Sequence, residues 1–182
     1  MRSVIELYAK ELTTGRLAFS FDHLSRVYFY AKKFSDDYDD QVLHAACFLY
    51  KIILGKNSKE DSAQRAAQIL SETGFPIEKI QRVVDAIFTS DLEDKPQSIE
   101  GKLLHDAIIV DNLGAIGFSR FSVGSFFWDR SSKIEEIYNN YKEYVEKAIN
   151  SFVLEESKEY CKSRIEFSNL ILQKLIEELE EE

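Results

Sequence analysis

The stretch LHDAIIVDNLGAIGFSR, residues 104–120, decides the fold that this sequence predicts. Apolar residues at helical spacing fill its first half, and two acids, Asp106 and Asp111, interrupt them. Side chains five positions apart on a helix point in different directions, so these two carboxylates are expected to diverge. Gly114 and Gly117 follow closely. Such closely spaced glycines indicate tight helix contacts or turns rather than a long regular element.

Outside this stretch, apolar residues recur at three- and four-residue intervals, as the buried face of a helix requires. Only two prolines and seven glycines punctuate the chain, which favours long helices. The expected helices are 24–34, 39–54 with Gly55 as its stop, 58–73, 76–88, one capped by Ser98, and a final pair at about 132–152 and 155–181. The sequence therefore predicts one all-α domain over residues 1–182, a bundle of about seven to eight helices.

The composition excludes several classes of function. A net charge of −9 argues against broad binding to nucleic acid or to an anionic membrane. The N-terminus carries acidic and polar residues where a signal peptide needs an apolar run, and no segment reaches the length of a membrane span. Cys47 and Cys161 fit neither a zinc pattern nor a disulfide framework. A cytoplasmic protein without nucleic-acid or membrane partners is expected.

Two further segments accompany the first, FDHLSRV at 21–27 and LHAACFLYKI at 43–52. In this order and spacing, the three resemble the motifs of the HD-domain metal-dependent phosphohydrolases, in particular a small bacterial and archaeal subgroup. The resemblance covers essentially the whole chain. It implies an HD-like helical bundle and a site where a divalent metal, held by a His, a paired His-Asp and a later Asp, activates water against phosphate.

The resemblance can be carried over position by position. His23 matches the first metal ligand, whereas Tyr50 and Lys51 stand where the His-Asp pair belongs. Ile108 takes the place of the last Asp, while Asp106 and Asp111 match the acids on either side of it in the motif. Ser90 falls where the subgroup carries a further His. Because Lys51 would repel a divalent ion, the metal site is expected to be degenerate and no cofactor is expected. Manganese, nickel, iron or zinc would bind only at a rearranged site.

Three interpretations of the old site remain open. Lys51 could pair with Asp106 or Asp111 and close the site as an internal ion pair, with Tyr50 filling volume. Lys51 could instead replace the metal as a positive centre that binds phosphate or another anion. The pocket is then expected to contain His23, Arg26, Tyr50, Lys51, Ser90, Asp106, Asp111 and Arg120. Thirdly, His23, Asp106 and Asp111 could form a relocated hydrolase site with His105.

The sequence favours a non-catalytic binding or regulatory protein, with a pocket for an anion or nucleotide at the old active site. The alternative is an active metal-dependent phosphohydrolase that acts on nucleotides through a rearranged site. A protein partner or a second copy of the chain is also conceivable, because the run Phe126-Phe127-Trp128 concentrates apolar surface and the last helix is apolar on one side.

Overall fold

The computed structural model describes residues 1–181, apart from the side chains of Trp128 and Asp129. Within this part of the chain there are nine α-helices, one π-helical turn and no strand. They are α1 (Arg2–Leu12), α2 (Phe21–Ala31), α3 (Asp40–Leu49), α4 (Ser58–Glu72), α5 (Ile77–Phe88), α6 (Ile99–Asn112), α7 (Gly114–Gly124), η1 (Ser125–Asp129), α8 (Ile134–Ser151) and α9 (Glu155–Glu180). The all-α prediction is confirmed, with one helix more than the expected upper number.

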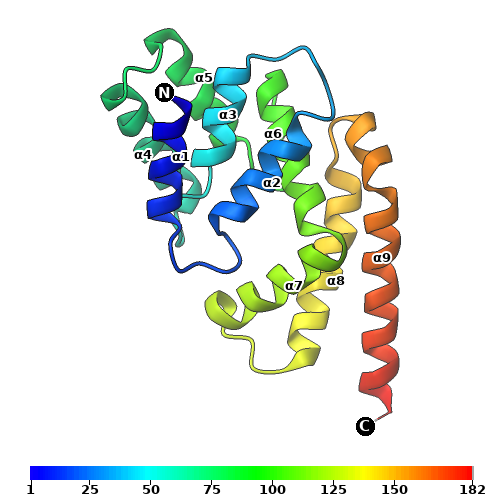
Figure 1. The fold of residues 1–182 in the computed structure, drawn as a ribbon. Helices are drawn as coiled ribbons and strands as arrows, with labels where there is room; N and C mark the ends of the chain where they lie inside the picture. The colour runs from blue at the N-terminus through cyan, green and yellow to red at the C-terminus, as the bar shows by residue number, and fades with distance from the viewer. Residues whose placement is uncertain (182) are drawn as a thin grey trace.

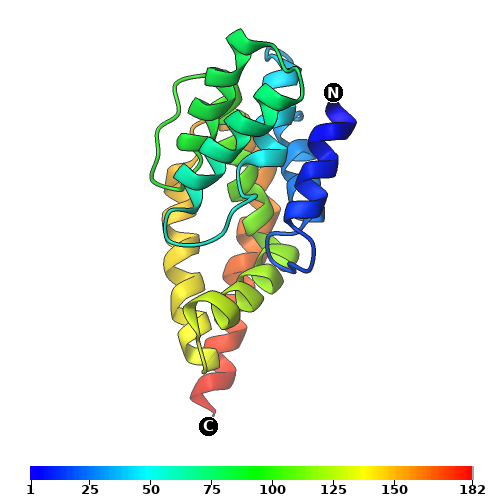
Figure 2. The ribbon, with the colours of Figure 1, turned by 90° about the vertical axis from the view of Figure 1, so that its left-hand side faces the viewer.

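Two central helices organise the bundle. Every residue of α3 from Val42 to Leu49 is buried, as its continuous apolar run predicts. α6 runs beside α2 and is buried over most of its length. Helices α1 to α5 gather on one side of α6, and the antiparallel pair α8 and α9 lies along the other side (Figure 1). The lower ends of this pair extend below the N-terminal helices, with α7 beside them (Figure 2). α6 therefore joins the two halves of the molecule.

Helix α1 was not expected from the sequence. Its buried residues are Ile5 and Ala9, and it packs on α3. Helical spacing does relate Ile5, Ala9 and Leu12, but this apolar face is narrow and contains few residues, so the pattern is weak. The helix is stabilised by docking on α3 more than by its own pattern.

The end of α3 corrects a sequence prediction. The helix stops at Leu49, several residues before the expected stop at Gly55. Beyond it the chain turns, and Arg16 donates to the carbonyl oxygens of Lys51 at 3.1 Å and Ile52 at 2.8 Å. A helix end leaves carbonyl oxygens without partners, and here the guanidinium of Arg16 binds two carbonyl oxygens just beyond it. The helix can therefore end without a glycine or proline at that point.

The glycine-rich region is a second correction, because residues 114–124 form the regular helix α7. Gly114 has φ +81°, in the left-handed region, and turns the chain sharply between α6 and α7. A Cβ at Gly117 would lie 2.2 Å from the carbonyl carbon of Asn112. The glycines thus permit a close helix junction, the tight contact that their spacing predicts, and do not prevent the helix.

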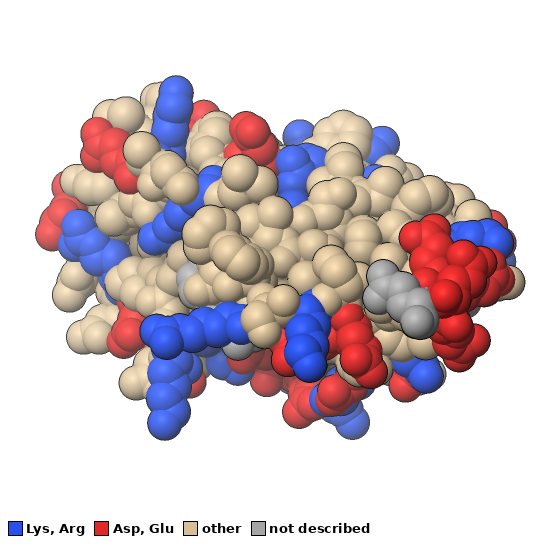
Figure 3. Space-filling model, turned by 90° about the horizontal axis from the view of Figure 1, so that it is seen from below, with Lys and Arg blue, Asp and Glu red and all other residues tan. Residues whose placement is uncertain are grey.

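The surface is not uniformly acidic. Uncharged residues fill the centre of the face seen from below, and acidic side chains gather toward its right-hand end (Figure 3). Phe126 and Phe127 are exposed, while the side chain of Trp128, the third member of that apolar run, lies outside the described residues. No described helix is both long enough and apolar enough to cross a membrane.

Candidate functional site

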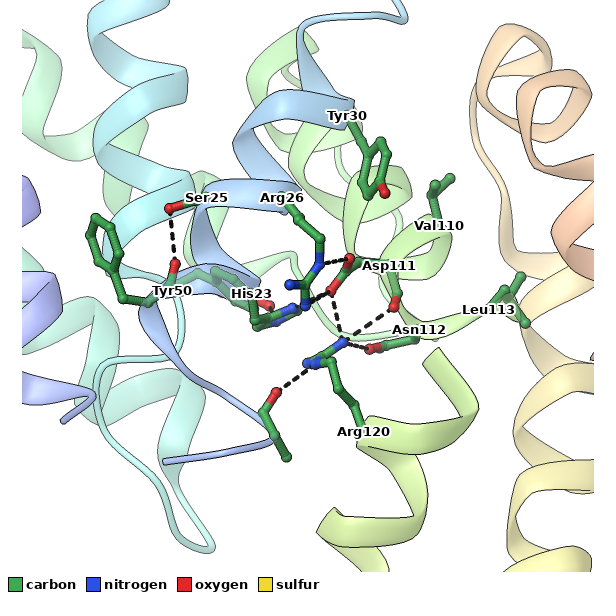
Figure 4. A network of polar contacts seen from close by, with 12 residues as sticks. His23, Ser25, Arg26, Tyr30, Tyr50, Val110, Asp111, Asn112, Leu113 and Arg120 are labelled. Carbon is green, nitrogen blue, oxygen red and sulfur yellow. Dashed lines mark hydrogen bonds and ion pairs between the residues drawn. The ribbon is translucent and has the colours of Figure 1, made fainter. Parts of the chain in front are cut away.

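A buried carboxylate, Asp111, is the centre of a polar network that joins α2, α6 and α7. From α2, Arg26 donates through Nε to Oδ1 at 2.6 Å and through Nη2 to Oδ2 at 3.1 Å. From α7, Arg120 donates through Nη1 to Oδ2 at 2.8 Å, and its Nε donates to the carbonyl oxygen of Ala18 at 2.6 Å. The two guanidinium groups reach Asp111 from different sides (Figure 4). This network fixes α2 and α7 to α6.

His23 completes the network from α2, and its two ring nitrogens are both engaged. Nδ1 lies 2.6 Å from Oδ2 of Asp111, and Nε2 contacts the hydroxyl of Tyr50. Burial, together with the charge of Arg120, lowers the pKa of His23 to about 4. The ring is therefore neutral at pH 7, with Nδ1–H donating to Asp111 and Nε2 accepting from the Tyr50 hydroxyl. Burial raises the pKa of Tyr50 well above its ordinary value, so that the phenol remains a donor.

These contacts decide whether the residues present fit a divalent metal. A histidine ligates metal through a free ring nitrogen, and His23 has none. Burial alone would raise the pKa of Asp111, but the hydrogen bonds from His23 and Arg26 hold it below its ordinary value. Its charge is already compensated by two arginines. Among residues 1–181, no group of three or more His, Cys, Asp or Glu side chains could hold an ion together. The family's metal does not fit this donor set.

The positions that should have held the metal nevertheless come together. Tyr50, Lys51, Ser90 and Ile108, contributed by the ends of α3 and α5 and by α6, line one cavity of about 180 Å³. Each of them was assigned by its match to a different family ligand. The fold thus brings these four positions to one cavity.

Lys51 opens onto this cavity and onto a second one. Its Nζ donates to Ser58 Oγ at 2.9 Å and lies 5.4 Å from the centre of the Phe19 ring. Burial lowers the pKa of Lys51. With the described residues Lys51 forms no ion pair, so the expected pairing with Asp106 or Asp111 is wrong. Asp111 pairs with Arg26 and Arg120, and Asp106 lies in a separate cluster at the start of α9.

The second cavity is larger, at about 590 Å³, and shares Phe19, Lys51, Asn112 and Tyr144 with the first. Its basic lining residues are Lys51, Lys56 and Arg120, and its polar ones include Ser58, Asn112 and Ser125. Of the predicted pocket residues, Lys51 and Arg120 thus face it together. His23, Arg26 and Asp111 are not among the lining residues of either cavity and form the wall network behind them.

Asp106 does not belong to the site at all. Its carboxylate accepts from the backbone N–H groups of Val153 at 3.1 Å and Leu154 at 2.9 Å, and from the Ser157 hydroxyl. His105 Nδ1 lies 2.8 Å from it. This cluster caps the start of α9 and latches the turn between α8 and α9 to α6. A relocated hydrolase site that uses Asp106 and His105 with His23 is therefore wrong, because these groups occupy two separate clusters.

Sequence analysis did not single out Lys56, Ser58, Phe19 or Tyr144, which line the larger cavity. Lys56 and Ser58 follow Gly55 in the turn that enters α4, a signal that was interpreted only as a helix boundary. Tyr144 is half-buried against the core and lines the cavity. Only the tertiary fold places these segments next to each other.

Comparisons with known proteins bear on the fold. No protein-family model matches the chain, and no curated protein sequence matches it. Among solved structures, a Lactobacillus plantarum protein superposes with a TM-score of 0.84 at 18% identity, over 100% of this chain and 97% of its own. A Bacillus thuringiensis protein described as an HD-superfamily hydrolase gives 0.73 at 20% identity, over 100% and 97%.

A third structure, Bacillus subtilis YpgQ in complex with ADP, superposes with a TM-score of 0.77 at 19% identity, over 98% of this chain and 97% of YpgQ. At such identities the similarity establishes the fold, and function must be argued from the site. The chain has the helical fold of the HD-superfamily hydrolases, as the three sequence segments predict.

Proposed function

We propose that this protein binds a phosphate-bearing small molecule, of the nucleotide class, in the joined cavities at the old active site, and that it has lost metal-dependent phosphohydrolysis. The observation that carries the proposal is the lysine at one of the metal-ligand positions: Lys51 lines both cavities and forms no ion pair with a carboxylate among the described residues. The resulting role is binding or regulation rather than catalysis.

The loss of hydrolysis follows from the donor set. Hydrolysis in this family needs a metal to activate water, and here both nitrogens of His23 and both oxygens of Asp111 are engaged within the protein. Rebuilding the metal site would require breaking a buried ion network. Tyr50 and Ile108, at two of the other ligand positions, offer no carboxylate or imidazole.

The nucleotide class is favoured by the size and lining of the larger cavity. A volume of about 590 Å³ lies within the range of small-molecule sites, roughly 300–1,000 Å³. Phe19, Phe121 and Tyr144 provide aromatic surface beside the basic residues. Aromatic rings stack with bases, and lysine and arginine bind phosphate. The ADP complex of YpgQ, which shares the fold, makes ADP the natural first probe.

The test is ligand-induced thermal stabilisation with ADP, pyrophosphate and inorganic phosphate in a buffer containing EDTA. A ligand at about 100 times its Kd stabilises the folded state by about 2.7 kcal/mol. Lys51→Ala should weaken binding about 10- to 100-fold, since it removes a charge-assisted hydrogen bond. Lys174→Ala, an exposed lysine paired with Glu177 on α9, is the matched control. An absence of stabilisation by all three anions would refute the proposal, and equal effects of the two substitutions would remove Lys51 from it.

A further inference from the structure

The charges around the joined cavities differ in kind from those of a metal site. The larger cavity is lined by Lys51, Lys56 and Arg120, and no Asp or Glu is among its lining residues. The smaller one adds Lys59 and Asp91, whose side chains pair with each other at 2.8 Å. A metal-dependent site has the opposite arrangement, with carboxylates and imidazoles around a cation.

Two of these ammonium groups lack a direct carboxylate partner, although the charge of Asp91 also acts on Lys51. Neither Lys51 nor Lys56 forms an ion pair with any residue of the described part of the chain. Arg120 is bound to Asp111, but Arg26 binds the same carboxylate, so the buried network keeps an excess of positive charge behind the cavity wall. The larger cavity therefore has a basic lining although the whole chain carries a charge of −9.

Lys51 also stands where the resemblance places a ligand of the family's metal. Its side chain lines both cavities. A divalent cation placed there with a nucleotide would lie within a few ångströms of this ammonium. At that distance the repulsion is large even with moderate screening.

We infer that the site selects the metal-free form of its phosphate ligand, so that Mg²⁺ opposes binding where the family's chemistry depends on a metal. This inference rests on the proposed function. Mg²⁺ removes two negative charges from a bound diphosphate and brings a cation toward Lys51. Both changes weaken attraction to a site built from ammonium and guanidinium groups. The protein would then respond to the fraction of nucleotide that is not complexed with Mg²⁺.

The experiment is calorimetric titration of the full chain with ADP, once in EDTA and once in saturating Mg²⁺, with NaCl adjusted to equal ionic strength. Saturating Mg²⁺ should raise the Kd of ADP on the order of tenfold or more. AMP is the matched control ligand, because it binds Mg²⁺ weakly and its Kd should change little. Lys51→Gln should weaken ADP binding and reduce the effect of Mg²⁺, whereas Lys174→Gln should alter neither.

The outcomes separate this inference from the function on which it rests. Binding of ADP that is tighter in Mg²⁺ overturns the inference and leaves the anion site in place. An equal loss of AMP and ADP affinity also overturns it, because Mg²⁺ would then act on the protein instead of on the ligand. If ADP binds under neither condition, the proposed function fails as well. Melting curves of the Lys51→Gln variant in the absence of ligand verify that it is folded.

Discussion

Helix α6 carries the buried carboxylates Asp106 and Asp111 and, between them, an isoleucine that lines a cavity. Asp106 and Asp111 are each surrounded by donors from other helices, while Ile108 contributes an apolar wall beside Lys51. The two acids match the family motif and the isoleucine departs from it. The two acids hold helices together, whereas the departing position lines a cavity. A motif can therefore contain residues that hold a scaffold together as well as residues that line a site.

The largest effect is expected from substitutions that place metal ligands in the smaller cavity. The combined substitutions Tyr50→His, Lys51→Asp, Ser90→His and Ile108→Asp place four metal-binding side chains around the cavity of about 180 Å³. Removing the Tyr50 hydroxyl also frees Nε2 of His23. The variant should take up about one Mn²⁺ per chain, since ligand number and geometry determine affinity. Elemental analysis and manganese titration measure this.

The unsubstituted chain is the control for the metal-site variant, and circular dichroism verifies that the variant is helical. A folded variant that binds no metal would mean that the four positions are not the family's ligand positions, and the comparison along α6 would break down.

The next largest effect concerns the scaffold. Asp111→Ala leaves Arg26 and Arg120 without their shared counter-ion in the interior, which should reduce the free energy of unfolding by about 3–5 kcal/mol. Lys51→Ala removes a single hydrogen bond to Ser58 and should cost less than about 1.5 kcal/mol. Urea denaturation of both variants measures the contrast. Similar losses of unfolding free energy in the two variants would show that Lys51 contributes as much to stability as the Asp111 network does.

An effect smaller than that of Asp111→Ala is the pH dependence of stability that His23 gives to the network. The pKa of His23 falls from 6.5 to about 4 on folding, so the unfolded chain binds a proton more readily below pH 6.5. This contribution to stability is complete above pH 6.5 and is lost as the pH falls toward 4. Between pH 7 and pH 5 the loss is about 2 kcal/mol.

His23→Gln is the test of this pH effect, because glutamine does not titrate. Its unfolding free energy should change less than that of the parent chain between pH 7 and pH 5. The groups that face His23 are Tyr50, Arg26, Arg120 and Asp111, and the lowered pKa of Asp111 places its own titration below this window. An unchanged pH slope in the variant would contradict the assignment of a neutral His23.

Much of the fold could be predicted because its determinants are local. The capping of α6 by Ser98 follows from neighbouring residues, and the side chain does accept from Gly101 N–H at 3.2 Å. The divergence of Asp106 and Asp111 follows from helical geometry alone. The end of α3 could not be predicted, since it depends on Arg16, which is distant in sequence from the carbonyls it binds.

The candidate site was predicted only in part, because a motif match identifies positions along the chain and not the contacts that other helices make with them. Alignment to a motif identified Tyr50, Lys51, Ser90 and Ile108, which the fold brings to one cavity. Alignment could not distinguish an acid that lines a cavity from one that caps a helix, because Asp106 and Asp111 occupy motif positions either way. Their roles depend on donors from α2, α7 and α9, which only the packed structure reveals.

The latch at Asp106 has a consequence for biosynthesis. Val153, Leu154 and Ser157 satisfy a carboxylate in the middle of the chain, and Ser168 on α9 accepts from the N–H of Gly114 at 2.9 Å. Before these residues dock, Asp106 is solvated, and burying α6 without them would leave a charge without partners, which is costly. Although domains usually begin to fold from the N-terminus during synthesis, α6 is therefore expected to become buried only together with the turn between α8 and α9.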